Sequence, residues 1–240
     1  MGRSSEARPA ARRRQIDGAG MLPLRACGPG QAPGAHAGAG EVPQGSRVAG
    51  VDEAGRGSLA GPVVAAAVIL PAEARIAGLT DSKLLAPTVR MRLAEEIATL
   101  ATAWAVAAVE ATEIDATDIL RATLRAMAAA VAGLEPRPGL VLVDGGITPA
   151  LGVPARAIVK GDRTVPAISA ASILAKVTRD RIMEAWAGRF PVYGFAQHKG
   201  YGTAEHRAAI ARYGPSPIHR RTFAGVREFA GDRAAQGSLW

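Results

Sequence analysis

The 240-residue sequence contains little sulfur and no long apolar stretch. Its one cysteine, Cys27, cannot form a disulfide within the chain, which fits a reducing compartment or a protein that makes no use of thiols. No segment approaches the roughly 18 consecutive apolar residues of a membrane-spanning helix. Residues 1–15 are rich in Arg without an apolar segment, which excludes a secretory signal and leaves an organellar transit peptide as the alternative. These absences predict a cytoplasmic protein without membrane attachment.

The first 46 residues also lack hydrophobic periodicity. Gly, Pro, Ala and Arg dominate them, so we expect residues 1–46 to be a disordered leader. The globular domain is expected over residues 47–230, where hydrophobic periodicity is sustained. The charged, Ala- and Gly-containing residues 231–240 are expected to be a flexible tail.

Acidic residues are scarce in the last third of the sequence. Residues 156–240 hold 14 Lys and Arg against six Asp and Glu, whereas residues 48–155 hold eight against 12. An acidic half joined to a basic half predicts carboxylates gathered around a metal and a cationic surface for a polyanion. A scattered, solvated basic surface is the alternative.

The pattern of apolar residues predicts an α/β domain. Hydrophobic residues make up 48% of the chain, enough for one sizeable core. Short apolar runs predict strands, and apolar residues at helical spacing predict helices. The predicted strands lie at 48–53, 62–70, 102–109, 140–143 and 155–159, and the predicted helices at 87–100, 113–134, 165–188 and 203–213.

Acidic residues follow three of these strands. Asp52 and Glu53 close the first, and Asp144 and Asp162 each follow a later one. Neighbouring strand residues point to opposite faces, so Asp52 and Glu53 can serve one site only if the strand ends or bends there. The Gly-Arg-Gly that follows allows a bend. A solvated carboxylate pair beside a turn is the alternative.

The composition of this acidic set favours hard metal ions. Four carboxylates without interleaved Cys or His match Mg²⁺ or Mn²⁺ better than Zn²⁺. Two such ions about 3.5 to 4 Å apart activate a water and stabilise the departing oxygen of a phosphodiester. Without metal the four acids would repel one another, so metal binding makes the cluster tolerable.

Two further patterns are typical of nucleic-acid binding. The helix predicted over 165–188 carries a polar stripe, for which a solvated face is the alternative. Basic segments with an aromatic residue, H-K-G-Y-G and P-I-H-R-R-T-F, grip a strand by phosphate contact and stacking. The stripe consists of Ser169, Ser172, Lys176, Arg179 and Asp180.

The motifs in this sequence closely resemble those of bacterial ribonuclease HII over nearly all of residues 47–225. The resemblance implies a ribonuclease H-like α/β fold, with a mixed five-stranded sheet flanked by helices and a C-terminal helical extension, in a monomer. The ribonuclease HIII branch looks different, because it lacks this Gly-Arg-Gly and usually has a folded N-terminal domain. The motifs are V-A-G-V-D-E-A-G-R-G, T-D-S-K, L-V-D-G, V-K-G-D, I-S-A-A-S-I-L-A-K-V-T-R-D, Y-G-F-A-Q-H-K-G-Y-G-T and P-I-H-R-R-T-F.

The same resemblance implies an endoribonuclease. Such an enzyme cleaves the RNA strand of RNA-DNA hybrids and ribonucleotides embedded in duplex DNA, as in ribonucleotide excision repair. Two Mn²⁺ or Mg²⁺ ions drive the hydrolysis and leave 5′-phosphate and 3′-hydroxyl ends. Position by position, the catalytic metal ligands fall on Asp52, Glu53, Asp144 and Asp162.

Substrate contacts follow in the same way. The backbone of Gly55, Arg56 and Gly57 senses the ribose 2′-hydroxyl, and Tyr201 stacks on the sugar at the RNA-DNA junction. Ser58 departs from the family, which commonly has proline there. The chemistry of the side chains adds phosphate contacts from Lys83, Lys176 and Lys199, and orientation of the backbone by Ser169 and Ser172.

Two other function classes compete with this one. A non-catalytic, basic nucleic-acid-binding protein is disfavoured, because carboxylates opposite a phosphate backbone cost affinity unless metal neutralises them. A metal-dependent phosphatase acting on small esters is disfavoured by the basic C-terminal half and Tyr201, since a small ester needs no extended grip.

The last five residues, 236–240, resemble the short Gln-x-x-Leu-aromatic peptides that dock on the DNA sliding clamp. Two apolar anchors on a flexible tail can enter a hydrophobic pocket while Gln236 fixes the register. Packing of this apolar terminus on its own domain is the alternative.

Overall fold

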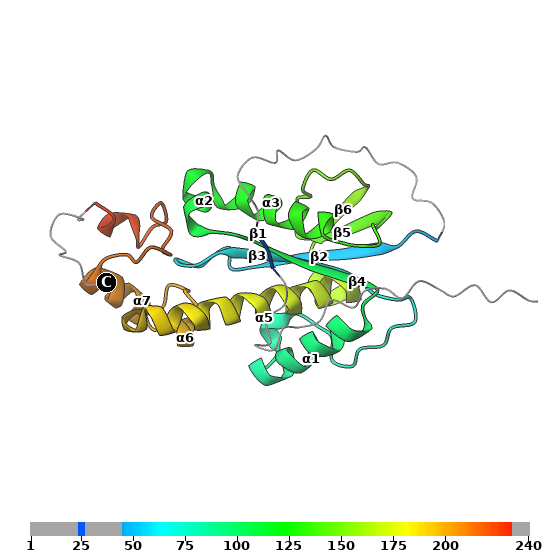
Figure 1. The fold of residues 1–240 in the computed structure, drawn as a ribbon, viewed down its shortest axis with the longest axis horizontal. Coiled ribbons are helices and arrows are strands. Elements are labelled where there is room, and N and C mark those ends of the chain that lie inside the picture. The colour runs from blue at the N-terminus through cyan, green and yellow to red at the C-terminus, as the bar shows by residue number, and fades with distance from the viewer. Residues whose placement is uncertain (1–23, 27–44, 232–240) are drawn as a thin grey trace, which may run out of the picture.

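The computed structural model describes residues 24–26 and 45–231 (Figure 1). One sheet runs through it, with strand order β1-β4-β3-β2-β5-β6. The pairs β2–β3 and β3–β4 are antiparallel and the pairs β1–β4, β2–β5 and β5–β6 are parallel, so the sheet is mixed, as expected. The strands are β1 (Leu24–Ala26), β2 (Val48–Ala54), β3 (Val63–Ile69), β4 (Ala103–Val109), β5 (Leu140–Asp144) and β6 (Ala155–Ile158).

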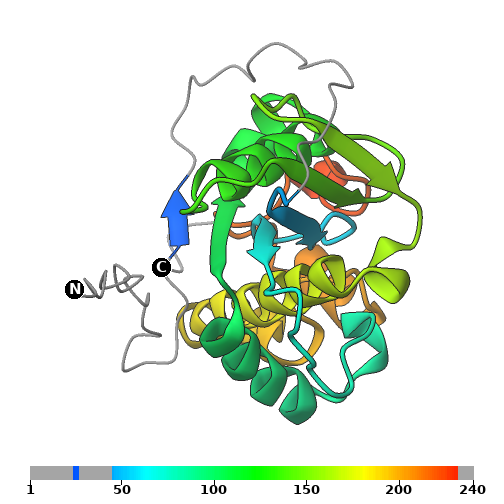
Figure 2. The ribbon, with the colours of Figure 1, turned by 90° about the vertical axis from the view of Figure 1, so that its right-hand side faces the viewer.

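Strands β2 to β6 are the five that the sequence predicts, and β1 is an addition. The prediction that residues 1–46 form no structure is wrong for Leu24–Ala26, which pairs with β4 at the edge of the sheet (Figure 2). An edge strand offers unpaired backbone groups that any extended segment can complete. Three residues are too few to show a strand pattern in sequence. Residues 1–23 and 27–44 of the leader and the tail after residue 231 lie outside the described residues.

Helices cover both faces of the sheet. Figure 1 shows α2 and α3 on one face and α1 and α5 on the other, with α6 and α7 at one end of α5. In the described part of the chain, no helix is long and apolar enough to cross a membrane. The helices are α1 (Pro87–Leu100), α2 (Ala111–Ala116), α3 (Ile119–Ala132), α4 (Gly161–Thr164), α5 (Pro166–Arg189), α6 (Phe195–His198) and α7 (Ala204–Tyr213), with 3₁₀ turns at Ser82–Leu84, Pro191–Tyr193 and Arg227–Phe229.

The single helix predicted over 113–134 is two helices. Thr117 leaves the helical conformation, and the Asp118 side chain accepts a hydrogen bond from the Arg121 amide at 2.8 Å. An aspartate that caps a new helix competes with continuation of the old one. The apolar stripe alone does not reveal this break, because it continues through both helices. Thr203 caps α7 as predicted, by accepting from the His206 amide.

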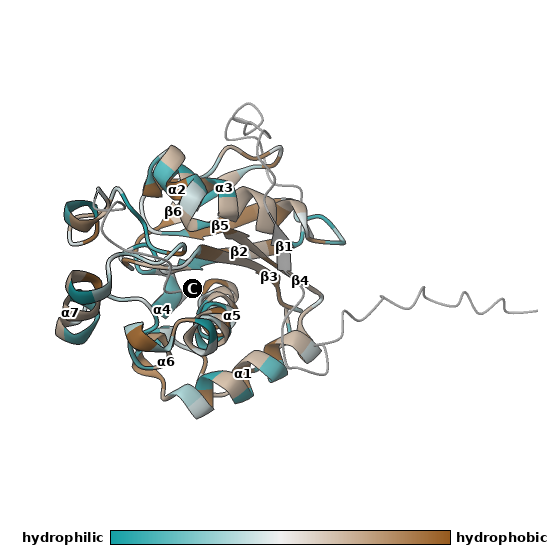
Figure 3. Ribbon diagram, turned by 60° about the vertical axis from the view of Figure 1, so that its left-hand side comes forward, coloured by the Kyte–Doolittle hydropathy of each residue, from teal (hydrophilic) through white to brown (hydrophobic). Residues whose placement is uncertain are grey.

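Two apolar layers sandwich the sheet. One lies between the sheet and α3, and the other between the sheet and the pair α1 and α5. Every residue of β3 and β4 is buried, and Figure 3 colours the central strands as hydrophobic. Many of these residues are alanines, so the helices approach the sheet closely.

The closest approach is at Gly50 in β2. A Cβ atom there would lie 2.1 Å from the carbonyl carbon of Ala167 and 2.3 Å from the amide nitrogen of Ile168, both in the α5 backbone. We expect Gly50→Ala to lower the free energy of unfolding by about 2 to 3 kcal/mol or more, because rigid backbone must move. Gly188→Ala in α5 is the matched control, since its Cβ would meet nothing within 4 Å. Equal melting temperatures for the two variants in a thermal scan would contradict this packing.

The C-terminal extension has its own aromatic core. Tyr193, Phe195 and Ile218 pack with Met183 of α5, and His206 and His219 are buried among them. Burial lowers the pKa of His206 to about 4 and that of His219 to about 3, and the positive charges of Arg207 and Arg221 contribute to this lowering. Both rings are therefore neutral in the folded protein at neutral pH.

These pKa values predict how stability depends on pH. An unfolded histidine binds a proton near pH 6.5, whereas these two histidines in the folded protein do not. Their contribution to the free energy of unfolding is therefore complete above pH 6.5 and is lost as the pH falls towards 4. The loss is about 1.4 kcal/mol per pH unit for each histidine. Urea unfolding between pH 7.5 and 4.5 should show a shallower loss for His206→Gln than for wild type. The acidic cluster is present in both proteins, so its effect cancels when their pH dependences are compared. Identical slopes of the free energy of unfolding against pH would contradict the prediction.

Candidate active site

Three carboxylates converge at one edge of the sheet. The parallel pairing of β2 and β5 ends at Val51 opposite Val143, so Asp52 and Asp144 come next on neighbouring strands. Asp162 joins them from α4, and its amide donates to Asp144 Oδ1 at 3.3 Å. One carboxylate oxygen from each of the three lies within 4.8 Å of the others. The juxtaposition expected of these three acids is present.

Asp162 reaches this place by a different route from the one predicted. It does not stand at a strand end, because β6 finishes at Ile158 and Asp162 lies in the first turn of α4. Lys160, with φ 58° and ψ 35° in the left-handed region, turns the chain into that helix. A left-handed lysine is uncommon and leaves no mark in a propensity pattern.

Glu53 lies beside this group of three. It belongs to β2, which continues in register with β3 as far as Ala54. Its side chain nevertheless forms a hydrogen bond with that of Asp52, and burial raises the pKa of the Glu53 carboxyl, to which the charge of Asp144 adds. The strand does not bend before Glu53. Its carboxylate forms an ion pair with Arg56 at 3.5 Å. The role of Glu53 as a metal ligand stays a prediction.

Burial and repulsion between carboxylates dominate the electrostatics of the cluster. Burial raises the pKa of the Asp52 carboxyl well above its ordinary value, the charges of Glu53 and Asp144 raise it further, and a hydrogen bond from Ser172 opposes them. Burial also raises the pKa of Asp162, and the charge of Asp144 adds to this. A divalent cation would reverse both effects. A group made of carboxylates alone is the donor set that Mg²⁺ and Mn²⁺ prefer, so the residues fit such an ion.

Serines from two elements support the acids. Ser172 of α5 forms a hydrogen bond of 3.0 Å with Ser82, and Ser169 donates to the Asp162 carbonyl at 2.7 Å. Ser169 and Ser172 are buried, so the alternative of a solvated stripe on this helix is wrong for them. Ser169 thus holds the backbone of Asp162. The contact of Ser169 and Ser172 with the substrate stays a prediction.

The T-D-S-K segment contributes a second charged residue, Asp81, to the surroundings of the site. Only Lys83 was expected to act there, yet Asp81 caps the turn by accepting the Lys83 amide at 2.9 Å and pairs with Arg163 at 3.2 Å. The positive charge of Lys83 in turn offsets part of the rise in the pKa of Asp162. An aspartate just before a short helical turn is a capping signal, which identifies Asp81 in the sequence.

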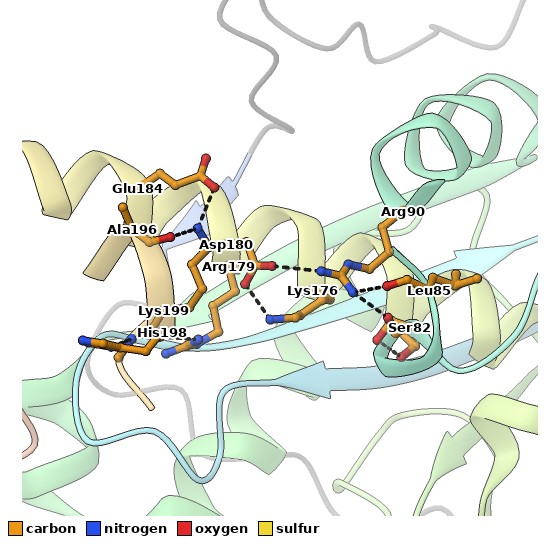
Figure 4. A network of polar contacts seen from close by, with 12 residues as sticks. Ser82, Leu85, Arg90, Lys176, Arg179, Asp180, Glu184, Ala196, His198 and Lys199 are labelled. Carbon is orange, nitrogen blue, oxygen red and sulfur yellow. Dashed lines mark hydrogen bonds and ion pairs between the residues drawn. The ribbon is translucent and has the colours of Figure 1, made fainter. Parts of the chain in front are cut away.

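Two of the lysines expected to contact phosphates are ion-paired along α5 (Figure 4). Lys176 Nζ lies 2.7 Å from Asp180, and Lys199 Nζ lies 2.7 Å from Glu184. Arg90 completes the network by pairing with Asp180 at 3.7 Å. A phosphate must compete with these carboxylates for the lysines. Their role in substrate binding stays a prediction.

Two buried arginines hold the Gly-Arg-Gly loop and the segment that follows it, as far as Pro62. Arg220 donates to the carbonyls of Gly55 and Arg56 at 2.7 and 2.8 Å, and Arg179 donates to that of Pro62 at 3.0 Å. Both guanidinium groups are fully buried, so Arg179 and Arg220 are not available for the contacts with a nucleic-acid strand that are expected of the polar stripe and of P-I-H-R-R-T-F. Backbone carbonyls take up their donors instead, a pattern that sequence does not reveal. Ser58 is also buried, and its amide donates to the Gly55 carbonyl at 3.3 Å to close the turn.

Tyr201 stands at the surface beside this loop. Its side chain is 37% exposed, and its ring lies 5.7 Å from Lys176 Nζ and 5.4 Å from the Arg179 guanidinium carbon. An accessible aromatic face with cations next to it is suited to stacking against a charged polymer. The placement fits the role expected of it.

Comparison with known proteins agrees with these features. The family described as Ribonuclease HII matches residues 49–226. A Ribonuclease HII from Bordetella avium (strain 197N) is 56% identical over 182 residues, which cover 76% of this chain and 90% of that protein. The crystal structure of ribonuclease H2 from Pyrococcus horikoshii OT3 matches with a TM-score of 0.66 and 30% identity, over 76% of this chain and 96% of that one.

A further solved structure is the PCNA:RNase HII complex from Archaeoglobus fulgidus. It matches with a TM-score of 0.64 and 27% identity, covering 80% of this chain and 98% of that one. The family match spans strands β3 to β6 and all of the acidic edge. The chain therefore belongs to the ribonuclease HII family, whose members are metal-dependent nucleases with a ribonuclease H-like fold.

Proposed function

We propose that this protein hydrolyses the RNA strand of RNA-DNA hybrids and cuts at ribonucleotides embedded in duplex DNA. The products carry 5′-phosphate and 3′-hydroxyl ends. The observation that carries the proposal is the convergence of Asp52, Asp144 and Asp162 within 4.8 Å. A monomeric, cytoplasmic protein, as the sequence predicts, completes the proposal.

The acids hold the catalytic ions. Asp52, Glu53, Asp144 and Asp162 would be the ligands for two Mg²⁺ or Mn²⁺ ions. When bound, such ions supply an activated water and charge stabilisation of the departing oxygen. Ser172 keeps Asp52 in place, and the Asp162 amide keeps Asp144 in place. The protein's own contribution is thus a set of oxygens fixed before the substrate arrives.

The neighbouring loop and tyrosine select the substrate. Arg220 fixes two successive carbonyls of the Gly-Arg-Gly loop, so that Gly55, Arg56 and Gly57 present their backbone to a ribose 2′-hydroxyl in one orientation. A Cβ atom on Gly57 would meet nothing within 4 Å, which leaves room for close approach of a sugar. Tyr201 stacks on the sugar at the junction, and Lys83, Lys176 and Lys199 contact phosphates.

One comparison of substrates tests this function against the two others. The protein is incubated with and without Mg²⁺ with a DNA duplex containing one ribonucleotide, the all-DNA duplex of the same sequence, and p-nitrophenyl phosphate. We expect cutting of the first alone, and only with Mg²⁺. Binding of the duplex without cutting would identify a nucleic-acid-binding protein, and hydrolysis of the small ester would identify a phosphatase.

We also propose that residues 236–240 dock on the DNA sliding clamp. These residues lie outside the described part of the chain, and their sequence supports the proposal together with the relative from Archaeoglobus fulgidus, solved in complex with PCNA. A titration of purified clamp should show binding of the full chain and loss of binding when residues 236–240 are deleted. Equal signals from the two proteins, or no signal from either, would exclude this docking without touching the catalytic proposal.

A further inference from the structure

The backbone around Tyr201 is held unusually firmly for a surface segment. Lys199 and Gly200 both have positive φ angles, 51° and 83°, so the chain makes a tight left-handed turn before Tyr201. Each carbonyl of the turn is hydrogen-bonded. That of Lys199 accepts from Arg179 at 2.9 Å, that of Gly200 from the Leu59 amide at 2.8 Å, and that of Tyr201 from the Thr203 amide at 2.9 Å and His206 Nδ1 at 2.9 Å.

The bond from His206 is the end of a longer chain of hydrogen bonds. His206 Nε2 lies 3.0 Å from His219 Nε2. His219 Nδ1 lies 2.9 Å from the Ser216 amide nitrogen and 2.7 Å from Ser216 Oγ. All three of these residues are buried, with at most 1% of each exposed. The chain thus runs through the interior from Ser216 to the carbonyl of the surface residue Tyr201.

The two ends of this chain fix where every proton lies. A backbone amide only donates, so His219 Nδ1 is an acceptor and the proton of the neutral ring is on Nε2. The Ser216 hydroxyl, which can donate or accept, then donates to the same Nδ1. The His219 Nε2 proton is donated to His206 Nε2, which leaves the His206 proton on Nδ1. A backbone carbonyl only accepts, so His206 Nδ1 donates to Tyr201. Read from either end, the assignment is the same.

A third histidine supports the arrangement from the side. The His198 ring stacks on that of His206 with centroids 4.3 Å apart and planes 18° apart. His198 Nδ1 accepts from the Gly200 amide at 3.1 Å, so its Nε2 carries the proton and donates to the Tyr193 carbonyl at 2.6 Å. The segment bearing Tyr201 is therefore bonded to histidines on both sides of the turn.

We propose that His219 and His206 form a proton-ordered chain that positions the main chain of Tyr201, and with it the aromatic face that meets the substrate. The proposal rests on the function proposed above, in which Tyr201 stacks at the RNA-DNA junction. Neither histidine belongs to the acidic group or to the surface, so both are positioning residues. The function assigned to Tyr201 needs its ring held in a fixed position beside the Gly-Arg-Gly loop. The chain of hydrogen bonds through His219 and His206 supplies that constraint.

The proton positions can be measured directly in the wild-type protein. Long-range ¹H–¹⁵N NMR correlations distinguish the two neutral forms of a histidine ring. We expect the Nδ1-protonated form for His206 and the Nε2-protonated form for His219 at pH 7. A His206 ring protonated on Nε2, or a ring carrying both protons, would overturn the proposal. This readout does not depend on nuclease activity.

Two substitutions of His206 separate positioning from general support of the fold. The amide of His206→Asn stands near the place of Nδ1 and can still donate to Tyr201, whereas that of His206→Gln stands near the place of Nε2. On a duplex with one ribonucleotide, we expect the Asn variant to keep kcat/KM within about threefold of wild type. The Gln variant should lose about tenfold, the size of one hydrogen bond. Equal losses in both variants would contradict the proposal.

A double-mutant cycle completes the test. If His206 acts through Tyr201, His206→Gln has its tenfold effect in the wild-type background and almost none in Tyr201→Ala. The same fold-loss in both backgrounds would show a structural role unconnected with Tyr201 and overturn the proposal. A wild-type protein that cuts no substrate would instead remove the function proposed above, while the NMR result would still decide whether the ordered chain exists.

Discussion

Asp144→Asn is expected to reduce cleavage to background while the protein stays folded. A neutral amide is a poor ligand for a hard cation. Asp144 links the other two acids of the cluster, because its carboxylate accepts from the Asp162 amide and its charge raises the pKa of Asp52. Substrate affinity should largely survive, because the basic C-terminal half supplies it. Cleavage of a ribonucleotide-containing duplex in Mg²⁺ is the measurement, and near-wild-type rates would contradict the assignment.

Thermal unfolding adds a second readout to the same variant. In EDTA, the Asn variant should melt at or above the wild-type temperature, because the substitution removes a charge that repels Asp52 and Asp162. Adding Mn²⁺ should raise the melting temperature of the wild type more than that of the variant. Glu96→Gln, which removes one carboxylate paired with Arg92 on α1, is the matched control and should keep full activity.

Tyr201→Ala is expected to lower cleavage at an isolated ribonucleotide by about ten- to a hundredfold, since a lost stacking contact is worth roughly 1 to 3 kcal/mol. Tyr201 is 37% exposed, so the melting temperature should change little. Tyr201→Phe keeps the ring and should retain most of the activity. An unchanged rate beside a lowered melting temperature would show that Tyr201 serves packing and not the substrate.

The architecture could be predicted from sequence where hydrophobic patterns are long. The all-buried strands β3 and β4 and the 24-residue α5 stand out as apolar runs and periodic stripes. The strand Leu24–Ala26 could not be predicted, because pairing at a sheet edge uses the backbone and needs no side-chain pattern. The break before α3 depends on one capping residue, Asp118, within a continuous apolar stripe.

The site could be predicted where the parallel direction of neighbouring strands brings its residues together. Asp52 and Asp144 follow neighbouring parallel strands, which places them together. Asp162 reaches the same point only through the left-handed turn at Lys160, which strand spacing does not indicate. The burial of Arg179 and Arg220 was not predictable either, since all but one of the carbonyls that accept from them lie more than 100 positions away along the chain. Sequence identifies the charged groups, and the fold decides which of them face the solvent.

The most direct test of the account is to identify the ends produced from an end-labelled duplex with one ribonucleotide. Attack by a water, which the acids and their ions would direct, releases the 3′ oxygen and leaves a 3′-hydroxyl and a 5′-phosphate. Attack by the substrate's own 2′-hydroxyl needs no metal and leaves a 2′,3′-cyclic phosphate and a 5′-hydroxyl. We expect the first pair of ends in Mg²⁺ and no cutting in EDTA; cyclic phosphate ends, or cutting that persists in EDTA, would contradict the assignment of Asp52, Asp144 and Asp162 as the catalytic centre.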